Sequence, residues 1–253
     1  MYWKTAIGSV IIITVAFVGQ VSAKETINVV STEGSVKLIK SGTKAGIACI
    51  PDTQLESGDW LSVGKASNVV VAFDDARKNL TKIEENTLVE IKDAAPDIIE
   101  LFNGTIVANL LGLSSGQQFV MRTPSGICGA RGTGWMVATD GLMTNVNVYQ
   151  HDVFFRGFNP DGSLKEEVTI GEGYSCDIIK YGDPGPIRKT DDAVLDALKK
   201  TANDLKGASG AGRESAGFGE KARHGIIMVN GVGVNVDIVD RIERLDEENI
   251  DER

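Results

Sequence analysis

The residues best suited to chemistry lie between Phe119 and Trp135, where Arg131 stands among Gly126, Gly129 and Gly132. A guanidinium on a glycine-rich turn can bind a carboxylate-bearing ligand, or it can hold the turn together through backbone carbonyls and an acid. We expect the structural role for Arg131. The spacing G-x-x-G-x-x-G differs from the G-x-G-x-x-G of dinucleotide sites, and no helix is expected to follow, so nucleotide binding is not predicted.

Metal and nucleophile chemistry have little support in the sequence. His151 and His224 are the only histidines, and neither has a second ligand at C-x-x-C or H-x-x-x-H spacing. No metal or other cofactor is therefore expected. Cys128 with His151 is one conceivable nucleophile and base, but no local nucleophile motif surrounds Cys128. We predict that the protein is not an enzyme and has no catalytic residue.

The three cysteines are Cys49, Cys128 and Cys176. In an oxidising compartment they allow one disulfide with one thiol left over, or three small core residues. If a disulfide forms, we expect it between Cys128 and Cys176, because both lie in the second half of the β region.

The tryptophans and the many acidic residues suggest an alternative function. Trp60 and Trp135 could form a stacking platform for a sugar, and paired carboxylates could hydrolyse one. An acidic chain always offers such pairs, however, and a tryptophan within a strand more often packs in the core. A carbohydrate-active hydrolase or a carbohydrate-binding protein on a β scaffold is therefore the second hypothesis.

Short runs rich in Val and Ile, broken by Gly, Asp, Asn and Pro, extend from Ile27 to about Ile179 and predict an all-β fold. Periodicity does not choose between a roll, a sandwich and a β-helix-like stack. Turns are expected at Asp74-Asp75, Asn103-Gly104, Asp140-Gly141 and Asn159 to Gly162. The predicted strands are Ile27–Val30, Ser35–Ile39, Trp60–Val63, Asn68–Phe73, Leu88–Ile91, Ile98–Phe102, Thr105–Asn109, Phe119–Arg122, Gly134–Ala138, Asn145–Tyr149, Val153–Phe155 and Glu167–Ile170.

The segment from Phe119 to Trp135 is predicted to be a strand, a forced turn with a glycine-rich bend, and a second strand. Pro124 fixes its own φ and favours an extended Thr123. The segment resembles the FecR-domain signature "F-x-V-x-T-P-x-G-x-x-x-x-R-G-T-x-F". The stretch from Leu55 to Phe73 likewise resembles the family's "L-x-x-G-D-x-I-x-T-G-x-x-S-x-V-x-L-x-F". The resemblance covers about Ile27 to Ile179.

The resemblance implies a compact β domain in which the signature residues stabilise the fold. These residues are Thr123, Pro124, Gly126, Arg131, Gly132, Thr133 and Trp135. The chain departs from the family pattern at Phe73 to Lys78, where Asp-Asp-Ala-Arg-Lys replaces the usual Asp-Gly, and a looser hairpin is expected there.

The N-terminus predicts export. Lys4 precedes an apolar run from Ala6 to Val18, and Val21 and Ala23 suit a signal-peptide cleavage site after Ala23. Removal of residues 1–23 takes away one cation and no acid, so the formal net charge changes from −9 to −10. Because the cations are scattered among acids, nucleic acid is not an expected partner.

The C-terminal part, residues 187–253, differs from the β domain predicted over 24–186. Thr190 is expected to cap an amphipathic helix that ends at Gly207, followed by a Gly/Ala/Ser-rich linker. Asn230-Gly231 between two apolar runs predicts a hairpin, Ile226 to Val236. A short, charged helix is expected from Asp237 to Arg253.

Together these features predict a periplasmic or secreted FecR-domain protein that binds, scaffolds or senses. Family members that regulate transcription carry a cytoplasmic anti-sigma segment and a membrane helix before this domain. This sequence leads from the signal peptide directly into the β domain, so direct contact with a sigma factor is not expected. The expected partner is a protein or polymer of the bacterial envelope.

Overall fold

A computed structural model of the protein describes residues 26–94, 97–113, 118–130 and 132–210. The fold is all-β with one helix at its C-terminal end, as the sequence predicts. Within these ranges no helix is both long and apolar enough to cross a membrane. The predicted signal peptide, Arg131, the hairpin 226–236 and the charged segment 237–253 lie outside the described residues.

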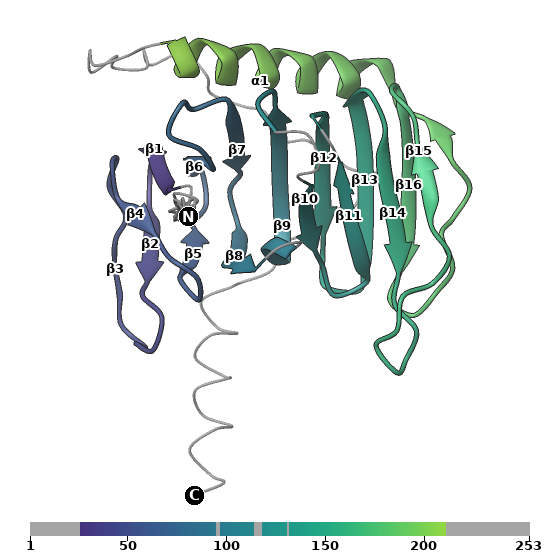
Figure 1. Cartoon of the computed structure of the whole chain (residues 1–253), viewed down its shortest axis with the longest axis horizontal. Helices are drawn as coiled ribbons and strands as arrows, with labels where there is room; N and C mark the ends of the chain where they lie inside the picture. Colours follow the sequence, from purple (N-terminus) through teal and green to yellow (C-terminus); the bar gives the residue numbers. More distant parts are fainter. Residues whose placement is uncertain (1–25, 95–96, 114–117, 131, 211–253) are drawn as a thin grey trace, which may run out of the picture.

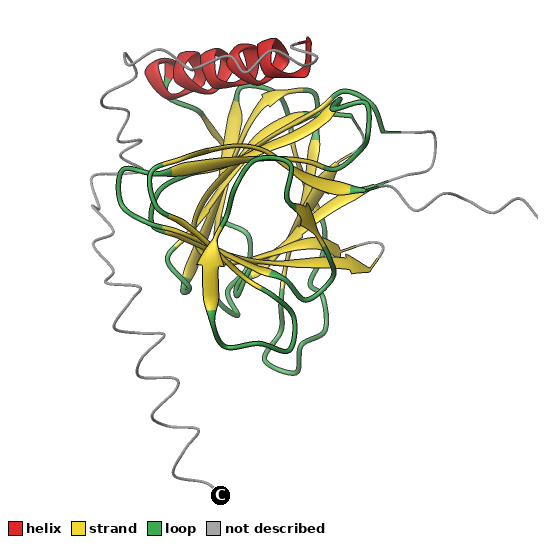
Figure 2. Ribbon diagram, turned by 90° about the vertical axis from the view of Figure 1, so that its left-hand side faces the viewer, coloured by secondary structure: helices red, strands yellow, loops and turns green. Residues whose placement is uncertain are grey.

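The strands form two stacked sheets (Figures 1 and 2). Sheet A contains, in spatial order, β4 (Gln54–Leu55), β1 (Ile27–Glu33), β6 (Asn68–Ala72), β7 (Asn79–Ile83), β9 (Asp97–Leu110), β12 (Gly134–Thr139), β13 (Met143–Gln150), β16 (Tyr174–Ile179) and β17 (Arg188–Lys189). Sheet B contains β3 (Gly46–Ala48), β2 (Val36–Ile39), β5 (Trp60–Val63), β8 (Thr87–Ala94), β9, β10 (Phe119–Arg122), β11 (Gly126–Ala130), β14 (Val153–Gly157) and β15 (Val168–Ile170).

Strand β9 belongs to both sheets. Its first half pairs with β8 and β10 in sheet B, and its second half pairs with β7 and β12 in sheet A. The prediction of a hairpin turn at Asn103-Gly104 is therefore wrong: the strand continues and bends at Gly104, where φ is +99°. A Cβ at Gly104 would lie 2.6 Å from the Cα of Thr87, so only glycine allows the strands to approach this closely.

A single apolar core fills the space between the sheets. Inward-facing side chains such as Leu61, Ile99 and Trp135 are fully buried. Of the pairings between described strands, β9 with β10 is parallel and the others are antiparallel. This pairing excludes a β-helix, whose successive coils would pair in parallel. Two sheets that face each other across one core, with β9 in common, form a sandwich-like arrangement.

The segment from Phe119 to Trp135 contains more strand than predicted. A tight turn at Thr123–Ser125 follows β10, as expected, but Gly126 to Ala130 forms the strand β11 instead of a glycine-rich bend. These glycines allow β11 to lie close to β14, so they serve strand packing and not chain reversal.

Helix α1 (Asp192–Gly210) crosses the outer face of sheet A from the β13 side to the β7 side (Figure 1). Two details differ from the prediction. The Asp191 carboxylate, not Thr190, caps the helix by accepting a hydrogen bond of 2.9 Å from the Ala193 N–H. The helix also continues to Gly210 rather than ending at Gly207.

Candidate functional site

The Thr-Pro turn of the FecR-like signature is held in place by buried hydrogen bonds. The Thr123 hydroxyl accepts from the backbone N–H groups of Ser125 (3.3 Å) and Gly126 (3.2 Å). It also lies 2.7 Å from the hydroxyl of Thr144 on β13. Thr123 and Thr144 are both buried, so this turn joins sheet B to sheet A and offers no group to a ligand.

The signature glycines are required by close approach. A Cβ at Gly126 would lie 2.2 Å from the Arg156 carbonyl oxygen on β14. Gly132 has a φ of +69°, a conformation that other residues rarely adopt. The side chains of Thr133 and Trp135 are buried in the core. Arg131 lies outside the described residues, so its predicted role stays a prediction.

Asp59 lies in the second FecR-like motif, from Leu55 to Phe73, and forms several hydrogen bonds there. Its carboxylate is fully buried and accepts hydrogen bonds from Ser41 N–H (3.0 Å), Glu56 N–H (2.9 Å) and Lys40 Nζ (2.8 Å). Burial acts to raise the pKa of Asp59, but these hydrogen bonds and the Lys40 charge outweigh it and hold the pKa below its usual range. The motif therefore stabilises the β4–β5 turn.

The cysteines are free thiols, and the disulfide considered between Cys128 and Cys176 is not formed. The Cys176 thiol donates to the Gly185 carbonyl oxygen at 3.3 Å. Burial raises the pKa of Cys128 to about 12. Because a nucleophile must be a thiolate, this sealed thiol is not suited to catalysis. His151 lies at the exposed turn after β13, its Nδ1 2.9 Å from the Gly132 carbonyl oxygen.

The outer face of sheet B carries aromatic and charged side chains suited to recognition. On it, Trp60 of β5 stacks on Phe102 of β9, with ring centroids 4.7 Å apart and an interplanar angle of 22°. Both rings are half-buried. Helix α1 lies on the opposite side of the sandwich, over sheet A, so it does not cover this pair.

A charged row lies next to the aromatic pair. Lys92 Nζ is 2.7 Å from Glu90 and 2.9 Å from Glu100, and Glu90 is the cross-strand neighbour of Trp60. Partial burial acts to lower the pKa of Lys92, but hydrogen bonds to both carboxylates outweigh it and raise the pKa. Arg122 extends the row, 4.0 Å from Glu100.

Arg122 also joins the row to a third aromatic ring, because its guanidinium lies 4.5 Å from the ring centroid of Phe158. Aromatic and charged side chains thus lie next to one another from β5 to β10, and the buried ring of Phe158, which follows β14, lies beside Arg122. We call Trp60, Glu90, Lys92, Glu100, Phe102 and Arg122 the sheet B platform.

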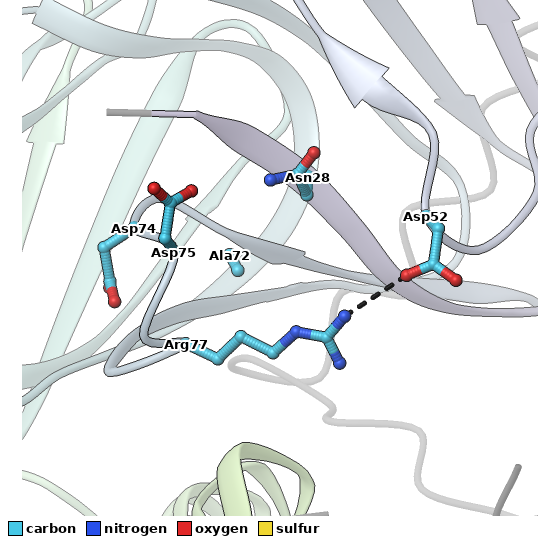
Figure 3. Close-up of a pocket in the computed structure, with 6 residues that line it drawn as sticks. All are labelled: Asn28, Asp52, Ala72, Asp74, Asp75 and Arg77. Carbon is cyan, nitrogen blue, oxygen red and sulfur yellow. Dashed lines mark hydrogen bonds and ion pairs between the residues drawn. The ribbon is translucent and has the colours of Figure 1, made fainter. Parts of the chain in front are cut away.

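A pocket of about 250 Å³ lies beside the β6–β7 turn (Figure 3). It is lined by Asn28, Asp52, Ala72, Asp74, Asp75 and Arg77. The turn lies where the sequence departs from the family pattern, between β6 and β7, and Arg77 in it has a φ of +53°.

Each carboxylate of this pocket already has a partner in the protein. Asp52 lies 3.2 Å from Arg77, Asp74 accepts from the Asn79 N–H at 2.6 Å, and Asp75 accepts from the Thr26 hydroxyl. In the described ranges, no three His, Cys, Asp or Glu side chains are placed to hold a metal ion. The pocket therefore contains turn-stabilising contacts rather than an acid and base pair.

The sequence indicated Trp60 as a candidate binding residue, but it did not predict which side chains lie beside it. Trp60 and Trp135 do not form a common platform, because Trp135 is buried in the core while Trp60 faces Phe102. Neither Phe102 nor the charged row was predicted. Alternation within β8 and β9 could have placed Glu90, Lys92 and Glu100 on one face, but it does not give the pairing between the two strands.

No protein-family model and no curated protein matches the chain. Part of the chain is similar to two crystal structures of a candidate anti-sigma factor from Parabacteroides distasonis ATCC 8503, at 1.65 Å and 2.50 Å. Each has a TM-score of 0.44 and 13% identity over 55% of this chain. The match spans 64% and 63% of those chains, which is less than two thirds. This likeness is too low to transfer a function.

Proposed function

We propose that this chain is an exported, non-enzymatic binding or scaffolding module of a bacterial envelope, built on a FecR-like domain. The observation that carries the proposal is the sheet B platform, in which a half-buried Trp60–Phe102 stack lies beside the Glu90–Lys92–Glu100 row. Aromatic residues and arginine are enriched at protein interfaces, and the platform contains Trp60, Phe102 and Arg122.

The signature residues support a non-enzymatic role. Thr123, Thr133 and Trp135 are buried, and Asp59 is fully occupied by backbone and lysine donors. The carbohydrate-active alternative would be favoured by carboxylates that converge with Trp60 or Trp135 in one cleft. In the described part of the chain, the acidic pocket has no tryptophan, and Trp60 lies on an open sheet face.

Capture from an envelope extract tests the proposal. We expect the native protein to retain envelope components, Trp60→Ala to retain at least about tenfold less, and the control Lys200→Ala on the exposed side of α1 to behave as native. Thermal unfolding of each variant separates lost binding from lost folding. Protein purified from the envelope should begin at Lys24.

Three outcomes would contradict the proposal. Equal capture by native protein and folded Trp60→Ala would remove the platform as the binding surface. An intact Met1 would overturn cleavage after Ala23. Turnover of an envelope glycan by the purified protein would favour the hydrolase.

A further inference from the structure

Strand β3 is an open edge of sheet B. Among the described strands it pairs with β2 alone, and its residues Gly46, Ile47 and Ala48 are all exposed. Edge strands are usually protected by charges or proline, as β17 is by Arg188 and Lys189. No residue within β3 provides such protection, so this edge is suited to receive another strand.

The free hydrogen-bonding groups of β3 can be assigned from its register. Cys49 N–H donates to the Val36 carbonyl oxygen at 2.9 Å. Because pairs alternate in an antiparallel ladder, Ile47 directs its backbone groups toward β2, while Gly46 and Ala48 direct theirs toward the open side. An added strand would bond to Gly46 and Ala48.

At this edge, one side chain of an otherwise buried apolar row is exposed. One core row runs across sheet B through Val89, Leu61 and Leu38, each fully buried, and its next member is Ile47. Ile47 is 56% exposed, and Ile50 in the following turn is 63% exposed. A strand beside β3 would cover Ile47 and complete the row.

The C-terminal end of α1 lies on the side of the molecule that carries this open edge. Leu205, near the C-terminal end of α1, packs on β6 and β7, on the side of sheet A that leads to β1 and β4. The edge lies three strand spacings beyond, roughly 15 Å, and the sheets are about 10 Å apart. Residues 211–225 can extend over about 50 Å, which is ample.

The segment after this connection has the matching chemistry. Residues 226–236 read Ile-Ile-Met-Val-Asn-Gly-Val-Gly-Val-Asn-Val and contain no charge. The sequence predicts a hairpin there, and an isolated two-stranded hairpin is marginally stable in water. We propose that this hairpin adds one strand to the open edge of β3 in the same chain, covering Ile47.

Amide hydrogen exchange in the full chain tests this docking. We expect the Ala48 amide to be protected at least about tenfold over its intrinsic rate. Met228→Pro, which removes a donor within the hairpin, should abolish that protection. The Ile47 amide should stay protected in both proteins because it is bonded to β2. Ala216→Pro, in the connection before the hairpin, is the matched control and should leave Ala48 protected.

Other results would overturn the inference. An unprotected Ala48 in the native chain would show that the edge is open. Protection that survives Met228→Pro would assign the cover to another segment. Protection that falls on dilution, together with a change from dimer to monomer mass, would show that a second copy provides the strand.

Discussion

At the scale of single residues, the FecR-like signature residues let strands pack closely and satisfy buried hydrogen-bonding groups. Thr123 satisfies two turn N–H groups, and Gly126 gives room to the carbonyl of Arg156. These roles explain why the signature contains small and hydroxylated residues at fixed spacing. A residue that resolves a steric or hydrogen-bonding conflict is determined by the fold, whatever the protein binds.

Asp59 gives a testable case. Asp59→Asn replaces a buried acceptor of three hydrogen bonds by an amide whose NH₂ faces donors, so we expect a loss of roughly 1–3 kcal/mol in the free energy of unfolding. The exposed control Asp196→Asn should change it little. Urea unfolding of both variants at neutral pH measures the difference.

The pH dependence of Asp59 has a defined sign. Its folded-state pKa lies below the ordinary value of 3.8, so its stabilising contribution is complete above that pH and is lost as the pH falls through the folded-state pKa. The native protein should therefore lose stability in this acid range more steeply than Asp59→Asn. Parallel acid titrations would contradict this assignment.

At the scale of elements, α1 is a packed part of the fold and not a loose appendage. Leu198 and Ala202 are buried against Val107, Met136 and Tyr149 on the outer face of sheet A. Burial raises the pKa of the Tyr149 phenol, whose hydroxyl donates to the Ala108 carbonyl oxygen. The helix thus covers an apolar face that would otherwise be exposed.

Truncation of one helix side chain measures this packing. Leu198→Ala should lower the free energy of unfolding by about 2–5 kcal/mol, because it removes a fully buried side chain between α1 and sheet A. The neighbouring exposed residue provides the control, and Lys199→Ala should cost little. A cost near zero for Leu198→Ala, measured by urea unfolding, would mean that α1 does not pack stably.

At the scale of the whole molecule, β9 joins the two sheets and the two halves of the chain. The N-terminal half pairs with β9 through β7 and β8, and the C-terminal half pairs with it through β10 and β12. The core between the sheets is one continuous cluster. We therefore expect both halves to unfold together.

The three free thiols report on this cooperativity. Cys49 is buried in the N-terminal half, and Cys128 and Cys176 are buried in the C-terminal half. All three should resist alkylation in the native protein and become reactive at one common midpoint of urea unfolding. Separate midpoints for Cys49 and Cys128, resolved by mass spectrometry of peptides, would show that the halves are independent. Fewer than three reactive thiols in denaturant would reveal a disulfide.

The sequence alone determined the all-β class, the turns at Asp140-Gly141 and Asn159 to Gly162, and the helix after the β region. Each depends on local conformational preference, which a few neighbouring residues set. Strands β3 and β17 escaped prediction because runs of three and two residues are too short to show an alternating pattern. The strand Gly126 to Ala130 escaped prediction because glycine has a low β propensity.

Only the tertiary structure decided which candidate side chains are exposed and which groups they contact. It buried Trp135 and left Trp60 on an open face, although both lie in strands of similar composition. It left the thiols of Cys128 and Cys176 free on strands of different sheets, and it made Asn103-Gly104 part of a strand that bends between the two sheets. The physical reason is that face, register and sheet membership are set by long-range pairing, which local sequence patterns do not encode.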